Sequence, residues 1–160
     1  MKTICIIPAR GGSKNLKNKN IKKLNSKPLI FYPINAAKKS GVCDHIFVTT
    51  DSPTIAHHAK KFGAEVPFLR KKKYSHSMTT TEETLKHALL SYEKFYNVKF
   101  DICVFLTCTN FFRKTEWVKK AVNNLKKNSK LDSSFVVTKL YRHFWHELKN
   151  NKLEKIAKWM

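Results

Sequence analysis

TICIIPARGGSK, residues 3–14, is the stretch that decides the fold of this chain, and Lys17 to Asn20 extend it. Thr3 to Ile7 predict an apolar strand that runs straight into a turn with two glycines. Gly11 and Gly12 let the backbone approach a ligand closely, and the arginine, serine and lysines around them favour an anion. The composition of this turn predicts a phosphate cradle, and therefore a nucleotide-binding protein.

Strand and helix patterns alternate along the rest of the sequence. We expect helices over residues 28–39, 53–62, 79–96 and 115–127, strands over 45–50, 101–106 and 133–137, a short extended segment over 64–69 and a loop over 70–78. This alternation predicts the α/β class, with a doubly wound, mainly parallel sheet and helices on both faces. The continuous apolar run over 101–106 indicates a central strand covered on both sides.

Two helix starts carry capping signals. Asp51 or Ser52 can cap the helix over 53–62. Thr79 or Thr80 can cap the helix that follows, where two glutamates lie near the positive end of the helix dipole.

Polar residues follow three of the expected strands, in the segments 10–19, 49–51 and 107–113. Ligands of doubly wound folds bind beyond the carboxyl ends of the strands. We therefore expect these three segments to form one site.

Length and composition limit the class of protein. The 160 residues, 42% of them apolar, fit one domain with a packed core. No apolar run approaches the ~20 residues of a membrane span, and the first strand is too short for a signal-peptide core. We expect a cytoplasmic protein that makes no membrane contact. The four cysteines form no CxxC pair and are expected as reduced thiols, with Cys5 and Cys103 buried in strands.

The net charge of +21 raises the question of nucleic-acid binding. Lysine supplies 28 of the 32 basic residues, and they are spread along the whole chain. Phosphate and base readers enrich arginine, whose planar fork binds bidentately. An AT-rich coding sequence produces the same lysine and asparagine bias on a solvated surface. We favour this second interpretation, so nucleic acid is not an expected partner.

The first turn matches neither G-x-G-x-x-G nor G-x-x-x-x-G-K-[ST]. Residues 7–21, IPARGGSKNLKNKNI, closely resemble the signature of the acylneuraminate cytidylyltransferases, or CMP-sialic acid synthetases, and of their relatives for pseudaminic and legionaminic acids. The resemblance continues through residues 27–30, 49–52, 55–70, 79–89, 101–113 and 133–138, and so covers nearly the whole chain.

The resemblance implies a nucleotide-diphospho-sugar transferase-like fold and a reaction. A hydroxyl of an acidic sugar attacks the α-phosphate of CTP and expels pyrophosphate, with Mg²⁺ as cofactor. By resemblance, the triphosphate is held by the catalytic residues Arg10, Lys14 and Lys19 together with Ser13 and the Gly11–Gly12 backbone, and the nucleoside by Asn20, Arg70, Thr79 and Thr80. Lys17 is expected to be a solvated side chain.

The acceptor side departs from the family pattern. Relatives typically carry QPTSPLR where this chain has TCTNFFR, residues 107–113. By resemblance, the acceptor sugar is bound by Thr107, Thr109, Asn110, Arg113 and Asp51. The alternative role for Asp51 is that of a helix cap. Threonine is shorter than glutamine and has no amide, so the acceptor is expected to be an unusual acidic sugar. An aspartate that is usual in the family aligns with Ser77.

The family's acidic magnesium ligands lie beyond the position of Met160, so we expect no metal ligand within this chain. We expect residues 1–160 to be a single nucleotidyltransferase domain without the family's C-terminal portion. A homodimer is expected if the full family architecture is present, with its contact near Phe144 and Trp145.

Several alternatives remain open. His143 and His146 could share a metal on a helix, but a strand or irregular element is favoured. Cys108 could be a thiol nucleophile, but a small loop filler is favoured because no partner histidine is identifiable. At the level of the whole chain, the alternatives to an enzyme are a nucleotide-binding protein without turnover and a basic nucleic-acid-binding protein.

Overall fold

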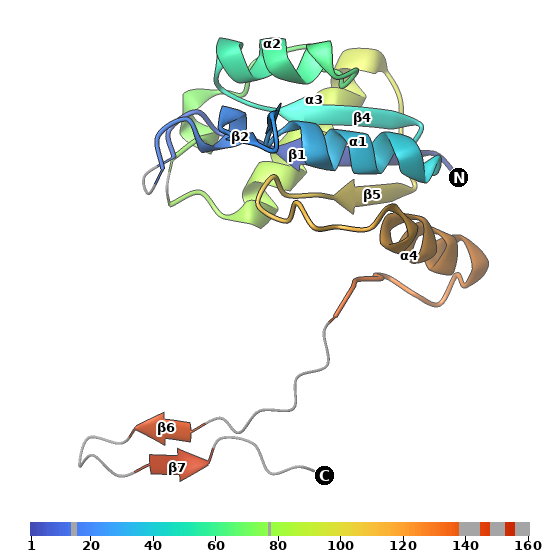
Figure 1. The fold of residues 1–160 in the computed structure, drawn as a ribbon. Coiled ribbons are helices and arrows are strands. Elements are labelled where there is room, and N and C mark those ends of the chain that lie inside the picture. Colours follow the sequence, from blue (N-terminus) through green and yellow to red (C-terminus); the bar gives the residue numbers. More distant parts are fainter. Residues whose placement is uncertain (14–15, 77, 138–144, 148–152, 156–160) are drawn as a thin grey trace.

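The computed structural model describes residues 1–13, 16–76, 78–137, 145–147 and 153–155 (Figure 1). Of the last two ranges only the backbone is described. They form the short strands β6 (Trp145–Glu147) and β7 (Leu153–Lys155), which pair antiparallel. None of the helices described here is long and apolar enough to cross a membrane.

A three-stranded parallel sheet lies at the centre of the fold (Figure 1). It contains β1 (Thr3–Pro8), β4 (His45–Thr49) and β5 (Ile102–Phe105), in the order β4-β1-β5. In the register of β1, Ile4 lies between His45 and Cys103. The first strand is thus the central one and is buried along its length, as its apolar sequence predicts.

Helices cover both faces of this sheet, which confirms the predicted fold class. Alternate residues of β1 point to opposite faces. Cys5 and Ile7 pack in a core with α1 (Phe31–Ser40), α2 (Pro53–Lys61) and α4 (Thr115–Lys127). Ile4 and Ile6 pack on the opposite face against α3 (Thr81–Tyr96), where Tyr92 is fully buried.

The helix predicted over 28–39 begins later, at Phe31. A small antiparallel ladder, β2 (Lys23–Leu24) with β3 (Lys27–Pro28), takes up the preceding residues after the 3₁₀ turn η1 (Lys19–Ile21). Asn25 and Ser26 connect the two strands with φ angles of 46° and 64°, the left-handed conformation of a tight hairpin turn. Pro28 pairs with Lys23 in this ladder, so it lies in a strand and not at the first position of the helix.

The capping signals are confirmed for one candidate of each pair. Ser52 caps α2 by accepting the N–H of Ile55 at 3.4 Å. Thr80 caps α3 in a reciprocal capping box, because its hydroxyl accepts the N–H of Glu83 and the Glu83 carboxylate accepts the N–H of Thr80. The helix-cap role considered for Asp51 is therefore wrong.

The prediction that residues 101–106 form a central strand is also wrong. Among the described residues, β5 pairs only with β1 and so forms one edge of the sheet. Cys103, predicted to be buried, is exposed, and Phe105 is 42% exposed. The outer edge of β4, by contrast, is covered at one point, where Glu65 exchanges backbone hydrogen bonds with Ile46 and Val48.

The predicted strand over 133–137 is not formed. The connection from β1 through α1 to β4 is right-handed, as Figure 1 shows. The helix α4 packs on the same face of the sheet as α1. The chain moves from β1 to β4 toward one edge of the sheet, whereas a strand added beyond β5 would lie at the other edge. A parallel strand there would make a left-handed crossover, which is found in only about 2% of cases.

Candidate functional site

A cavity of about 330 Å³ opens where the carboxyl ends of β1 and β5 and the loops that follow them face residues 70–84. Two of the three predicted polar segments, 10–19 and 107–113, contribute to its lining, whereas none of residues 49–51 does. That third segment only braces the site, through Asp51 and the backbone oxygen of Thr50. The predicted residues that line this cavity are Arg10, Ser13, Lys19, Asn20, Arg70, Thr79, Thr107 and Thr109.

Hydrogen bonds fix the glycine turn at the mouth of the cavity. Asp51 Oδ1 accepts the N–H of Gly11 at 2.8 Å, which ties the turn to the end of β4. Asn20, only 6% exposed, donates from Nδ2 to the backbone oxygen of Arg10 at 3.0 Å. The N–H of Ser13 bonds back to the oxygen of Gly11 at 3.0 Å. The turn is therefore held in shape from both sides before any ligand binds.

The two glycines of the turn differ in their surroundings. A Cβ at Gly11 would lie 3.1 Å from the Cβ of Ser52 and 3.8 Å from Asp51 Oδ1. A Cβ at Gly12 would meet no atom within 4 Å. Close packing disfavours a side chain at the first position only, and the exposed second glycine leaves space beside the turn.

Arg70 lies deep in the cavity wall and is only 5% exposed. Its Nε donates to Ser75 Oγ at 3.0 Å, and its backbone N–H donates to the oxygen of Thr50 at 2.7 Å. Its Nη1 is buried and has no hydrogen-bond partner within the described structure. Burial lowers the pKa of the guanidinium, Asp51 raises it and Arg10 lowers it. A buried cationic donor without a partner is costly, and a ligand atom that accepts its hydrogen would remove that cost.

The cavity is electropositive. Arg10, Lys19 and Arg70 line it, and none of the described residues that line it is an aspartate or a glutamate. Such a wall favours a polyanion. Hydroxyl groups from the segment after β5 and from the start of α3 add neutral donors and acceptors to this wall.

Thr107, Cys108 and Thr109 form the wall after β5. The hydroxyl of Thr109 donates to that of Thr107 at 3.4 Å. Burial raises the pKa of Cys108 to about 12, although Lys19 and Arg113 act in the opposite direction. The thiol is therefore protonated at neutral pH and is a poor nucleophile, which supports its interpretation as a filler of the loop.

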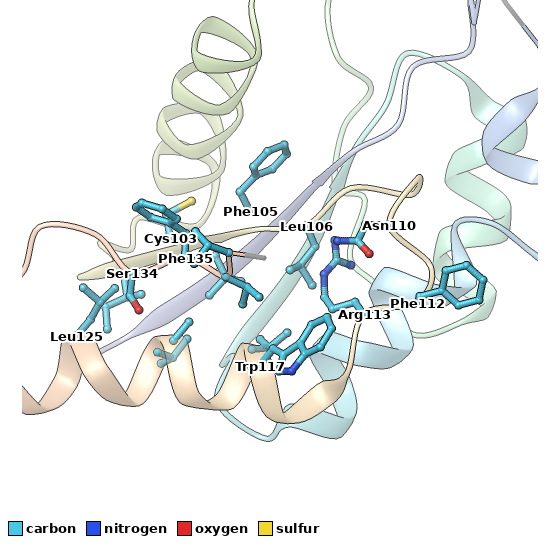
Figure 2. Close-up of a pocket in the computed structure, with 17 residues that line it drawn as sticks. Cys103, Phe105, Leu106, Asn110, Phe112, Arg113, Trp117, Leu125, Ser134 and Phe135 are labelled. Atoms are coloured by element: carbon cyan, nitrogen blue, oxygen red, sulfur yellow. The ribbon is translucent and has the colours of Figure 1, made fainter. Parts of the chain in front are cut away.

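Asn110 and Arg113 line a second cavity, of about 660 Å³, between β5 and α4 (Figure 2). The Arg113 guanidinium lies beside Asn110, with Leu106 and Trp117 near it (Figure 2). Its Nη2 donates to the oxygen of Thr107 at 3.5 Å, and burial lowers its pKa. The structure thus divides the predicted acceptor residues between two cavities.

Other predicted residues lie elsewhere. Thr80 is engaged in the capping box, Asp51 holds the turn from outside the cavity lining, and Lys17 is exposed as expected. Lys14, Ser77 and His143 lie outside the described residues, and only the backbone of His146 is described. No three His, Cys, Asp or Glu side chains converge as a metal site in the part of the chain that the structure describes.

Sequence reasoning missed one wall of the first cavity. The residues Tyr74, Ser75, His76, Thr81 and Thr84 also line it. They come from the turn η2 (Lys72–Tyr74), the residues after it and the first turns of α3. Tyr74, Ser75 and His76 lie between Arg70 and Thr79 in the sequence, and the other two follow Thr79 by two and five residues. Closeness to Arg70 and Thr79, both predicted to bind, is the signal that could have found them.

This chain resembles known proteins over most of its length. A family model described as Cytidylyltransferase matches residues 4–157. CMP-N,N'-diacetyllegionaminic acid synthase of Legionella pneumophila is 39% identical over 122 residues, which are 76% of this chain and 52% of that protein. N-acylneuraminate cytidylyltransferase of Streptococcus agalactiae is 42% identical over 124 residues, 76% of this chain and 29% of that protein.

The fold also matches solved structures. That of CMP-2-keto-3-deoxy-manno-octonic acid synthetase complexed with CTP superposes with a TM-score of 0.66 at 21% identity, covering 82% of this chain and 50% of that one. The chain spans about half the length of the first of these relatives and less of the second.

Proposed function

Because the chain belongs to the cytidylyltransferase family, we propose that its cavity binds CTP and that the protein transfers the cytidylyl group to an acidic sugar. The products would be a CMP-sugar and pyrophosphate. One observation carries the proposal: an open cavity at the strand ends is lined by Arg10, Lys19 and Arg70, with no carboxylate among its described lining residues. The names of the relatives indicate a nonulosonic acid as the class of acceptor.

The glycine turn would hold the triphosphate. Arg10, Lys19 and the Ser13 hydroxyl line the cavity. The predicted Gly11 and Gly12 do not line it, and the N–H groups of Gly11 and Ser13 are already bonded within the protein. Displacement at the α-phosphate needs an in-line geometry and neutralisation of the charge on the leaving pyrophosphate. Cations held in fixed positions orient the triphosphate and neutralise the charge on the leaving pyrophosphate, without moving during the reaction. Lys14 would join them, as the resemblance implies.

The nucleoside would lie toward Arg70 and α3. Arg70 Nη1 is a buried donor without a described partner, and cytosine offers its O2 and N3 as acceptors. The hydroxyls of Thr79 and Thr84 line the same end of the cavity and suit a ribose. Asn20 would contact the nucleoside while it braces the turn through the oxygen of Arg10.

The acceptor sugar would approach from the wall formed by Thr107 and Thr109. Thr107 stands where the family pattern has a longer glutamine, and Thr109 matches that pattern. The shorter side chain leaves more room at this wall for a branched acidic sugar. Its carboxylate would find the electropositive lining of the same cavity. Asn110 and Arg113, which line the second cavity, would support the loop instead of touching the sugar directly.

Magnesium belongs to the family's reaction, but the described residues of the cavity do not fit it. Mg²⁺ prefers carboxylate and phosphate oxygens, and none of the described lining side chains is a carboxylate. The described residues of this cavity therefore offer the metal no protein ligand of its preferred kind. A homodimer, expected from the family architecture, remains a prediction.

Calorimetry with CTP, UTP, GTP and ATP would test the nucleotide site. CTP should bind most tightly, and Arg10→Ala should abolish its binding. Lys17→Ala removes an equal charge from the same turn at an exposed position and should leave the affinity unchanged. Equal affinity for all four nucleotides, or an unaltered Arg10→Ala variant, would contradict the proposal.

Pyrophosphate release would then separate an enzyme from a binding protein. With CTP, Mg²⁺ and an acidic nonulosonic sugar, an enzyme releases pyrophosphate in proportion to CMP-sugar. A protein that only binds is stabilised by CTP and releases none. A nucleic-acid-binding protein would show a steep negative salt dependence for duplex or single strands and no response to CTP.

A further inference from the structure

Tyr74 and His87 stack face to face behind the wall that sequence reasoning missed. Their ring centroids are 3.8 Å apart and the ring planes differ by 30°. Tyr74 belongs to η2 and lines the nucleotide cavity, whereas His87 lies on α3 and does not line it. The stack therefore joins a short turn at the cavity to a long helix that is anchored in the core through Ala88 and Tyr92.

The same turn holds Arg70. Ser75, next to Tyr74 in sequence, accepts from Arg70 Nε at 3.0 Å. Its own N–H bonds to the oxygen of Lys72 at 2.8 Å, and the N–H of Tyr74 bonds to the oxygen of Lys71 at 3.0 Å. Both bonds close the turn on itself, so they do not fix it to the rest of the protein. The ring stack attaches it to α3, and the hydroxyl of Thr79, which donates to the oxygen of Lys73 at 3.4 Å, adds one bond to the segment just before that helix.

The surroundings of the His87 ring disfavour its protonation. Its Nδ1 is buried without a described partner, and its Nε2 lies 3.4 Å from the hydroxyl of Ser91. Burial lowers its pKa, and the cations of Lys71, Lys73 and Arg70 lower it further. The carboxylate one turn earlier on α3, Glu83, is engaged by Thr80 and does not offset them.

We propose that His87 is a positioning residue for nucleotide binding: it holds Tyr74, and thereby the Ser75 hydroxyl that aims the buried Arg70 guanidinium into the cavity. That the ligand is CTP rests on the proposed function, but the contacts that link His87 through Tyr74 and Ser75 to Arg70 do not. His87 touches no nucleotide. It acts through two intermediate side chains, and its removal would let the turn shift and the guanidinium rotate away.

The affinity for CTP tests this proposal. We expect His87→Ala to raise the Kd for CTP about tenfold, which corresponds to about 1.4 kcal/mol. His87→Phe keeps a neutral ring of similar size and should restore the affinity to within about threefold. His57→Ala is the matched control, because His57 is an exposed histidine on α2, outside the cavity lining. All titrations are made well below the unfolding temperature of each variant.

A double-mutant cycle separates positioning from a general loss of stability. If His87 acts through Arg70, then adding His87→Ala to Arg70→Ala changes the Kd for CTP by less than about twofold. Additive losses of affinity, or an unchanged Kd in His87→Ala alone, would overturn the inference and leave the proposed function standing.

A measurement made without nucleotide tests the role of His87 independently of the proposed CTP site. In ¹⁵N-labelled protein, the Nε–H of Arg70 is buried and bonded, so its resonance should exchange slowly with water; Arg70→Lys assigns it. We expect fast exchange in His87→Ala and protection again in His87→Phe. Equal protection in all three proteins would overturn the inference, whether or not CTP binds.

Discussion

Asp51 and Gly11, forty residues apart in sequence, are joined by a hydrogen bond of 2.8 Å from the glycine N–H to Oδ1 of the carboxylate. The bond links the turn after β1 to the end of β4, and these two strands pair in parallel up to Pro8 and Thr49. It gives Asp51 a structural role that neither a helix cap nor a direct contact with sugar describes. The cavity's shape therefore depends on a residue that does not line it.

Replacing Asp51 tests this dependence. Asp51→Ala removes the acceptor and leaves a part-buried N–H without a partner, which should lower the free energy of unfolding by about 1–2 kcal/mol. The Kd for CTP should rise as the turn loosens. Asp51→Asn keeps an oxygen acceptor and should lose less of both. Urea unfolding and calorimetry measure the two effects, and equal behaviour of the two variants would contradict the role assigned to the bond.

The two glycines provide a second, matched test. Gly11→Ala places a Cβ 3.1 Å from the Cβ of Ser52, closer than a relaxed contact, so a part of the turn must move. We expect a loss of about 1–3 kcal/mol in stability, the usual cost of overpacking. Gly12→Ala meets open space and should change the stability by less than about 0.5 kcal/mol. Urea midpoints of the two variants, measured side by side, decide the point; equal midpoints would refute it.

Thr80 distinguishes capping from binding. Because its hydroxyl accepts the N–H of Glu83, Thr80→Ala should cost about 1 kcal/mol of stability. The Kd for CTP should change little, since Thr80 does not line the cavity. Thr54→Ala, at an exposed position on α2, serves as the control for stability. A large rise in Kd without loss of stability would instead assign Thr80 to the nucleotide.

Titration of His87 predicts a pH dependence of stability. Burial and the neighbouring cations lower its pKa in the folded chain, so the unfolded chain takes up the proton at higher pH. The free energy of unfolding should therefore fall as the pH drops below the unfolded value of about 6.5. His87→Phe lacks this contribution.

Urea unfolding of wild type and His87→Phe at about pH 7.5 and about pH 5.5 isolates the effect, because all other groups titrate in both proteins. The wild type should lose more stability than the variant between these values. Parallel losses would show that His87 is not protonated more easily in the unfolded chain.

That the lining residues after β1 and β5 lie close together could be predicted from the sequence, because it follows from the topology of the sheet. Parallel strands end at one edge of the sheet, so Arg10, Ser13, Lys19 and Thr107 had to meet once the strands were recognised. The wall around Tyr74 could not be predicted in the same way. Stacking of Tyr74 on His87 joins residues thirteen apart without any periodic pattern that marks the contact.

The position of β5 within the sheet could not be read from its residues. An apolar run such as Ile102 to Phe105 can form a central strand or an edge strand, and its composition does not distinguish the two. The hairpin before α1 was missed for a related reason. Asn25 and Ser26 form its turn, but its strands are only two residues long and carry no alternation to recognise.

The bare edge of β5 has a practical consequence for the isolated chain. Its outward backbone groups pair with no strand among the described residues, and no lysine or proline within the strand blunts them. Such an edge templates the addition of another molecule, and mutual repulsion at a net charge of +21 is the force that opposes it. Salt screens that repulsion. We therefore expect solutions of this chain to stay monodisperse at low ionic strength and to aggregate as salt is added, measured by light scattering.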